Sequence, residues 1–179
     1  MATNYGFTDT AHGDAPYGQT YELSTTAQGG ATIAYAPVSA GTIQSCYLTK
    51  DGDPNNGAWV DSLTQTVSLD VSLANMNIRA RCLVGRTDGT NTILQEGTFT
   101  AYQTLTTAVT YTFSPVAPAW TDAQENVANQ YYILFEFNNL DDMMQQSVTI
   151  NLFDTGAVTA DSYVAANIAA ATRRVFIIS

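Results

Sequence analysis

The sequence predicts an all-β protein: an antiparallel, jelly-roll-like β-sandwich of about eight to nine strands, preceded by an extended N-terminal arm. Short runs rich in β-branched and aromatic residues recur at spacings of about 8 to 15 residues, separated by Gly, Pro, Asn and Asp. Several runs alternate apolar with polar residues, as half-buried strands do. Strands do not alternate with long helical patterns, which disfavours an α/β fold.

Length and composition indicate one globular domain. The chain has 179 residues, of which 45% are hydrophobic, and this is enough for one packed core but short for two. We expect an arm over residues 1–30 and a single β-sandwich domain over residues 31–179. No apolar run reaches about 18 residues, so no membrane-spanning helix is expected.

The first segment, residues 1–30, is rich in Gly, Thr, Asp and Ala and has no strand or helix period. It is therefore predicted to be irregular. One interpretation is a flexible, solvated terminus. The other is an arm whose aromatic side chains bind a neighbouring subunit. The partner-binding candidates are its four aromatic residues, Tyr5, Phe7, Tyr17 and Tyr21.

Strand patterns begin at residue 31. Residues 31–38 and 43–49 are predicted strands joined by a turn. Residues 66–73 alternate most clearly, with apolar side chains at every second position facing a core. Residues 77–86 repeat this pattern with arginines pointing outward, and the Asp-Gly pair that follows predicts a hairpin with residues 92–100.

The second half of the chain supplies the remaining elements. Residues 106–113 form a predicted strand that ends before two prolines. Residues 131–139 and 147–153 are predicted to be a central antiparallel pair, and the first of these is apolar on both faces, which implies cover on both. The Ala-rich residues 162–172 are predicted to form a short helix. Residues 175–178 would be a terminal strand, either paired or buried.

Charge excludes one class of partner. Sixteen acidic residues face six basic ones, for a formal net charge of −10, and such a field repels phosphate backbones, so nucleic acid is not an expected partner. The N-terminal sequence lacks the basic and apolar regions of a secretory signal, and synthesis in a host cytoplasm is expected. Cys46 and Cys82 are expected to be buried and reduced, with a bridge between strands as the alternative.

No catalytic pattern is present, and the chain is not expected to be an enzyme. His12 is the single histidine and Lys50 the single lysine, which leaves histidine-based triads, zinc sites and nucleotide chemistry without partners. Paired carboxylates on strands hydrolyse glycosides in some folds. Asp70, Glu96 and Glu136 are the acidic residues to test for this role, each expected to be a lone charge on an exposed face.

One loop has the spacing of a calcium site. Asp51, Asp53 and Asn55 place oxygen ligands at alternate positions, as calcium loops do. Asn56 and Ser62 stand where such loops have glycine and a bidentate glutamate, so an ordinary Asx-rich turn is the default and no other cofactor is expected.

Two tryptophans are candidate contact residues. Trp59 and Trp120 follow polar or proline-containing stretches. An exposed indole there would stack on a sugar ring or anchor a protein partner. A rim residue that caps the core is the commoner role.

Three runs carry a resemblance: NIRARCLVGRTDGTNTILQEGTFTA at residues 77–101, then TYTFSPV and YYILFEFNN. They resemble the jelly-roll or lectin-like sandwiches of tailed-bacteriophage virion proteins and carbohydrate-binding modules, over about residues 31–156. The resemblance implies a virion structural protein, a capsid decoration or cement protein. Its partners would be the major capsid protein, other virion proteins and further copies of itself. The alternative is a carbohydrate-binding module or adhesin, including a phage tail or fibre component.

Overall fold

The computed structural model describes most of the chain, and this part consists of strands without helices. The described residues are 2–18, 20–24, 32–35, 41–49, 59, 63–74, 77–106, 109–119, 130–141, 147–152 and 162–167. They contain twelve strands. The predicted all-β class is confirmed.

The strands vary from two to ten residues in length. In chain order they are β1 (Ala2–Ala11), β2 (Thr20–Ser24), β3 (Thr32–Tyr35), β4 (Thr42–Thr49), β5 (Thr66–Ala74), β6 (Ile78–Thr87), β7 (Ile93–Glu96), β8 (Gln103–Thr104), β9 (Val109–Phe113), β10 (Gln130–Asn139), β11 (Val148–Asn151) and β12 (Tyr163–Asn167).

All twelve strands belong to one sheet that is not closed. Ten follow the order β3-β11-β5-β12-β1-β2-β4-β10-β6-β7, while β8 pairs with β6 and β9 with β5. The sheet is mixed, because β2 runs parallel to β4, so the expectation of purely antiparallel strands is wrong. Eight to nine strands were also too few: short strands such as β8 are too brief to show a period in the sequence.

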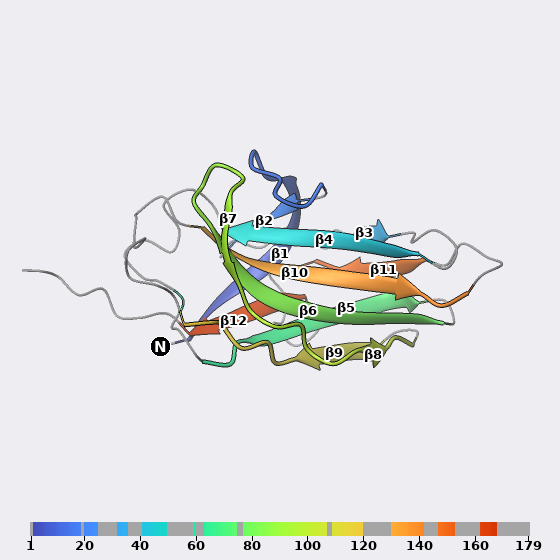
Figure 1. The fold of residues 1–179 in the computed structure, drawn as a ribbon. Coiled ribbons are helices and arrows are strands. Elements are labelled where there is room, and N and C mark those ends of the chain that lie inside the picture. The colour runs from blue at the N-terminus through green and yellow to red at the C-terminus, as the bar shows by residue number, and fades with distance from the viewer. Residues whose placement is uncertain are drawn as a thin grey trace, which may run out of the picture.

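The long sheet folds over so that its two halves face each other. Figure 1 shows β4, β10 and β6 as one layer, with β3, β11 and β5 behind it. Ring contacts cross between the layers: Tyr35 of β3 stacks on Phe137 of β10 at 5.1 Å, and Phe113 of β9 meets Phe135 edge-on at 5.8 Å. The main apolar core therefore lies between the two halves.

The central strand of the front layer is β10, which pairs along its whole length with β6 and also with β4. Its odd-numbered side chains, such as Phe135, enter the main core. On its other face Tyr132 and Leu134 join Cys46, Leu48 and Leu83 in a second buried group, here called the outer cluster. The expectation that this strand is covered on both faces is confirmed.

The predicted pairing of residues 131–139 with residues 147–153 is wrong. β11 pairs with β3 and β5 in the opposite layer. The reason is that both edges of β10 are already occupied by β4 and β6. Val148 and Ile150 of β11 instead complete the back wall of the core, where both are fully buried.

Two strands, β1 and β2, lie within residues 1–30, where an irregular segment was expected. β1 pairs with β12 on one side and β2 on the other, so it joins the two halves of the sheet. Tyr5 and Phe7 point into the main core. Asn4, Gly6 and Asp9 are of types depleted in strands. The two aromatics alone give an alternation that is too short to predict a strand.

A second correction concerns residues 162–172, predicted to be helical. Tyr163–Asn167 form β12, which pairs with β1 and β5. Alanine favours helix intrinsically, but here Val164 and Ala166 alternate into the core, and tertiary packing overrides propensity. Residues 168–172 and the predicted strand at 175–178 lie outside the described residues.

The predicted hairpin is confirmed, since β6 pairs with β7. In its loop Gly89 and Asn91 adopt left-handed conformations, with φ of 79° and 67°. The Asp88 carboxylate accepts hydrogen bonds from the Thr90 hydroxyl and from the N–H groups of Thr90 and Thr92. These bonds, above all that from the Thr90 side chain, lower the pKa of Asp88. One side chain, that of Asp88, therefore bonds to two residues of the loop.

The two cysteines are free and buried, as expected. Cys46 belongs to the outer cluster and Cys82 to the main core, so they lie on opposite faces of the sheet, on strands separated by β10. A bridge between them is therefore excluded by the fold. Burial raises the pKa of both thiols.

Candidate functional site

The outer face of the β4-β10-β6 layer carries a row of polar side chains at one end of the outer cluster. Outward positions alternate with core positions along β6 and β10, which places Arg79 opposite Asn138 and Arg81 opposite Glu136. Tyr102 comes from the segment before β8, which pairs with β6. These five residues are here called the arginine–tyrosine patch.

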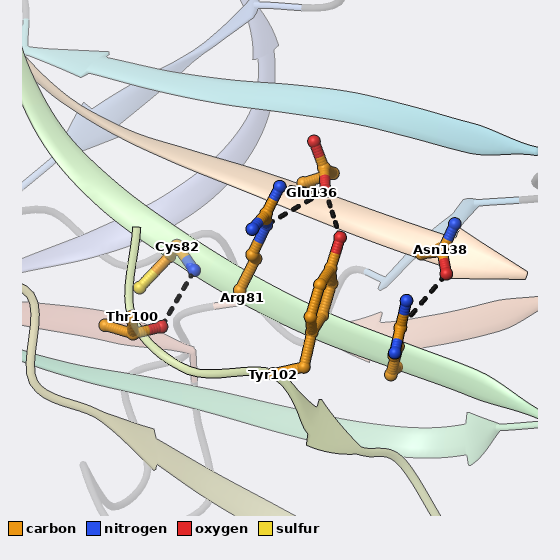
Figure 2. A network of polar contacts seen from close by, with 7 residues as sticks. Arg81, Cys82, Thr100, Tyr102, Glu136 and Asn138 are labelled. Carbon is orange, nitrogen blue, oxygen red and sulfur yellow. Dashed lines mark hydrogen bonds and ion pairs between the residues drawn. The ribbon is translucent and has the colours of Figure 1, made fainter. Parts of the chain in front are cut away.

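Glu136 is the acceptor at the centre of this patch. Both Nε and Nη2 of Arg81 lie 2.9 Å from its Oε1, and the Tyr102 hydroxyl donates to the same oxygen. Figure 2 shows Arg81 and Tyr102 converging on Glu136. Burial, and secondarily the bond to Glu136, raises the pKa of Tyr102. The Glu136 carboxylate neutralises the charge of Arg81 within the protein.

Arg79 is held differently. Its guanidinium lies 4.0 Å above the Tyr102 ring, and its Nε donates to Asn138 Oδ1 at 3.0 Å. The Arg81 guanidinium contacts the same ring at 4.4 Å, and the Phe99 ring at 4.3 Å. Among the described residues Arg79 forms no ion pair, so the patch carries two guanidinium charges and one carboxylate.

At the other end of the outer cluster lies a loop of residues 12–18, here called the strap. Tyr17 of the strap packs on the cluster, with its ring 5.9 Å from that of Tyr132. The hydroxyls of Tyr17 and Tyr132 both donate to Glu96 Oε1. Burial, followed by the bond to Glu96, raises the pKa of both tyrosines. One carboxylate therefore fastens the strap to the sheet.

A groove of about 380 Å³ lies between two irregular segments, residues 96–100 and 114–118. Its walls carry the hydroxyl-bearing residues Thr98, Thr100 and Ser114 beside apolar and proline residues. The segments approach closely at Gly97, where a Cβ would lie 2.6 Å from the Val116 carbonyl oxygen. This site therefore depends on a glycine.

The exposed apolar residue Val116 lines this groove, and a second exposed apolar residue, Leu63, lies on the segment that pairs with it. Val116 is 49% exposed and Leu63 45% exposed. They are neighbours because Thr64 pairs with Val116 and the Ala117 N–H donates to the Leu63 carbonyl oxygen. Ile93, 39% exposed, lies on the edge strand β7.

The four predicted partner-binding aromatics are not gathered on one free surface. Tyr5 and Phe7 are buried in the core of their own chain. Tyr21 is half-buried against that core, and Tyr17 lies in the strap.

Of the predicted contact tryptophans and calcium ligands, the structure describes Trp59 alone. Trp59 is fully buried, stacked on Tyr131 at 5.6 Å. Trp120 and the calcium candidates Asp51, Asp53 and Asn55 lie outside the described residues. Within the described ranges no group of three or more His, Cys, Asp or Glu side chains is arranged to hold a metal ion.

The three candidate catalytic carboxylates lie on three different strands, β5, β7 and β10. Asp70 lies on β5 in the back layer, where it accepts from Asn151 Nδ2 and the Thr110 hydroxyl. Glu96 pairs with position 85 of β6 and Glu136 with position 81, a separation of roughly 13 Å along the strand. His12 lies in the strap, with Nδ1 accepting from the Asp14 N–H at 2.9 Å. The described geometry assembles no acid–base pair from them.

The chain matches no known protein-family model, and no curated protein resembles it significantly. Within the described part, no helix is long and apolar enough to cross a membrane.

Sequence reasoning missed both the patch and the groove. The outward direction of Arg79 and Arg81 was predictable from alternation. Their partners were not, because Glu136 and Tyr102 meet them only once β10 lies beside β6 and residues 97–104 fold back along it.

Proposed function

We propose that this chain is a virion structural protein, a capsid decoration or cement protein that binds and stabilises a capsid lattice through protein–protein contacts. The observation that carries the proposal is the exposed apolar residue Val116 in the groove, with a second exposed apolar residue, Leu63, on the paired segment. Contiguous exposed apolar surface is a feature of protein–protein contact sites. The resemblance to phage virion sandwiches supplies the kind of partner.

The surface chemistry agrees with a structural role. Only 12% of residues are charged, so contacts would rest on shape and apolar area with few ion pairs. The edge strands β3 and β7 offer further positions for a neighbouring subunit, including another copy of this chain. A jelly-roll-like sandwich is part of this proposal, because the sequence resemblance points to that fold.

The test is the location of the protein in purified virions. Immunogold electron microscopy with an antibody against this chain is expected to label capsids. Absence of the protein from the particles would refute the proposal.

A binding experiment then tests the groove. Leu63→Ser with Val116→Ser is expected to reduce co-sedimentation with capsids at least tenfold, which corresponds to about 1.4 kcal/mol. Val109→Ser is the matched control, because Val109 is 43% exposed but lies on β9. Equal loss in the control would show that the groove residues have no special part.

The alternative proposal is a carbohydrate-binding module or adhesin, including a tail or fibre component. The groove favours it through its hydroxyl-bearing walls, although burial of Trp59 removes one of its two aromatic candidates. Glycan-array binding that is lost in Trp120→Ala or Thr98→Val would support this alternative over the first proposal. An array without any bound glycan would count against it.

A further inference from the structure

Two of the basic residues of this acidic protein, Arg79 and Arg81, lie together in the arginine–tyrosine patch. The chain has six basic and sixteen acidic residues. Within the described residues, Arg79 and Arg81 are the two Lys or Arg side chains that are not buried, since Arg86 is fully buried. Glu136 balances Arg81. One positive charge, that of Arg79, is left over.

The Arg79 guanidinium is also fixed in place. One face lies on the Tyr102 ring, and Nε is committed to Asn138. Asn138 lies on β10, which pairs with β6, the strand that carries Arg79. A guanidinium with its stem and one face fixed loses little conformational freedom when its remaining N–H groups bind an acceptor.

An exposed leucine lies two positions beyond the Arg79–Asn138 pair in the strand register. Leu140 is 52% exposed, and its N–H donates to the Asn77 carbonyl oxygen, two residues before Arg79. It follows Asn138 by two positions, which continues the outward side of β10. Arginine and tyrosine are the residue types enriched at binding hot spots, and here an apolar contact adjoins them.

We propose that Arg79 binds a carboxylate of a protein partner, and that Leu140 receives an apolar side chain next to that carboxylate. This inference rests on the proposed function, because it names the partner chemistry of a protein–protein contact. An arginine–carboxylate pair is the charge-assisted contact that suits a planar guanidinium with free N–H groups.

The charge balance favours a monoanion over a polyanion. A single uncompensated cation lies next to the Glu136 carboxylate on a chain of net charge −10. A phosphate would place two charges there and meet more repulsion than a carboxylate. A carboxylate within an otherwise uncharged surface fits best.

The experiment titrates the isolated protein while the Arg Nε–H signals are followed by NMR. The probes are sodium acetate and sodium 4-methylpentanoate, with sodium chloride and sodium phosphate at equal ionic strength. Arg79→Lys assigns the Arg79 signal, and Arg81 is the internal control. We expect a saturable shift at Arg79 with both carboxylates. The branched tail should tighten binding at least about threefold, since one buried methylene contributes about 0.8 kcal/mol.

Each alternative outcome contradicts a part of the inference. Equal responses at Arg79 and Arg81, or the same response to chloride, would overturn the carboxylate site. Tighter binding of phosphate would overturn the monoanion assignment. A tail effect that persists in Leu140→Ser would remove Leu140 from the site. No capsid takes part in this titration. A negative result would therefore overturn the carboxylate site without bearing on the virion proposal, which the immunogold experiment tests.

Discussion

At the level of single residues, Gly85 shows how one missing side chain shapes the outer face. It lies opposite Tyr132 in the β6-β10 register, and a methyl group there would overlap the tyrosine ring. Gly85→Ala is expected to lower the free energy of unfolding by about 1–3 kcal/mol, the usual cost of overpacking. Urea unfolding followed by circular dichroism measures it.

The control for this prediction is Gly13→Ala. No atom lies within 4 Å of a Cβ built at Gly13, so a change below about 0.5 kcal/mol is expected. Similar losses in the two variants would show that the Tyr132 ring is not the cause.

The buried tyrosine pair Tyr35 and Tyr47 should make stability depend on alkaline pH. Their hydroxyls lie 2.5 Å apart in the core, and burial raises the pKa of both. The folded state keeps them neutral while the unfolded chain ionises, so their contribution is complete below about pH 10 and declines as pH rises, by up to about 1.4 kcal/mol per pH unit each.

Urea unfolding between about pH 9 and pH 11 tests this. Tyr47→Phe removes one ionisable group, keeps the ring and leaves Tyr35 bonded to Ser45. Its stability should decline less steeply than that of the native protein. Identical slopes would contradict the assignment.

At the level of elements, Glu136 connects β10, β6 and the segment before β8. Glu136→Gln keeps the shape but leaves Arg81 without its carboxylate, and a loss of about 1–2 kcal/mol is expected because the Glu136 side chain is only 12% exposed. Asp9→Asn, at an exposed position on β1, is the control. The difference between the variants should shrink in high salt if charge is the cause.

The strap offers a second test at this scale. Tyr17→Ala should uncover part of the outer cluster and increase binding of an apolar fluorescent dye. Tyr17→Phe keeps the ring and loses the hydroxyl with its bond to Glu96, a cost of about 0.5–1.5 kcal/mol, with little added dye binding. Dye binding that is unchanged in Tyr17→Ala would show that other residues keep the cluster covered.

These elements also show what the sequence alone predicted. Alternation correctly gave the inward side chains of β5, β6 and β10, because period two is a local property. Strand partners were not accessible: β11 follows β10 in the chain but pairs across the core. β1 was missed because two aromatics among Asn, Gly and Asp give too weak a pattern. The patch was missed because its members meet only through that pairing.

For the whole molecule, the strand order predicts a gradient of local stability. β10 is bonded on both sides and buried on both faces. β3 and β7 lie at the two ends of the sheet. Amide hydrogen exchange should therefore be slowest in β10 and fastest in β3 and β7. Slower exchange in β7 than in β10 would contradict this order.

The position of β1 has a consequence for biosynthesis. β1 is made before the other described strands, yet one of its edges is paired only by β12, the last of them in chain order. At roughly 5–20 residues per second, its amides wait on the order of 10 s for that partner. During this time the nascent chain carries an open strand edge beside Tyr5 and Phe7. The ribosome-bound protein would therefore be expected to need a chaperone until residues 163–167 emerge.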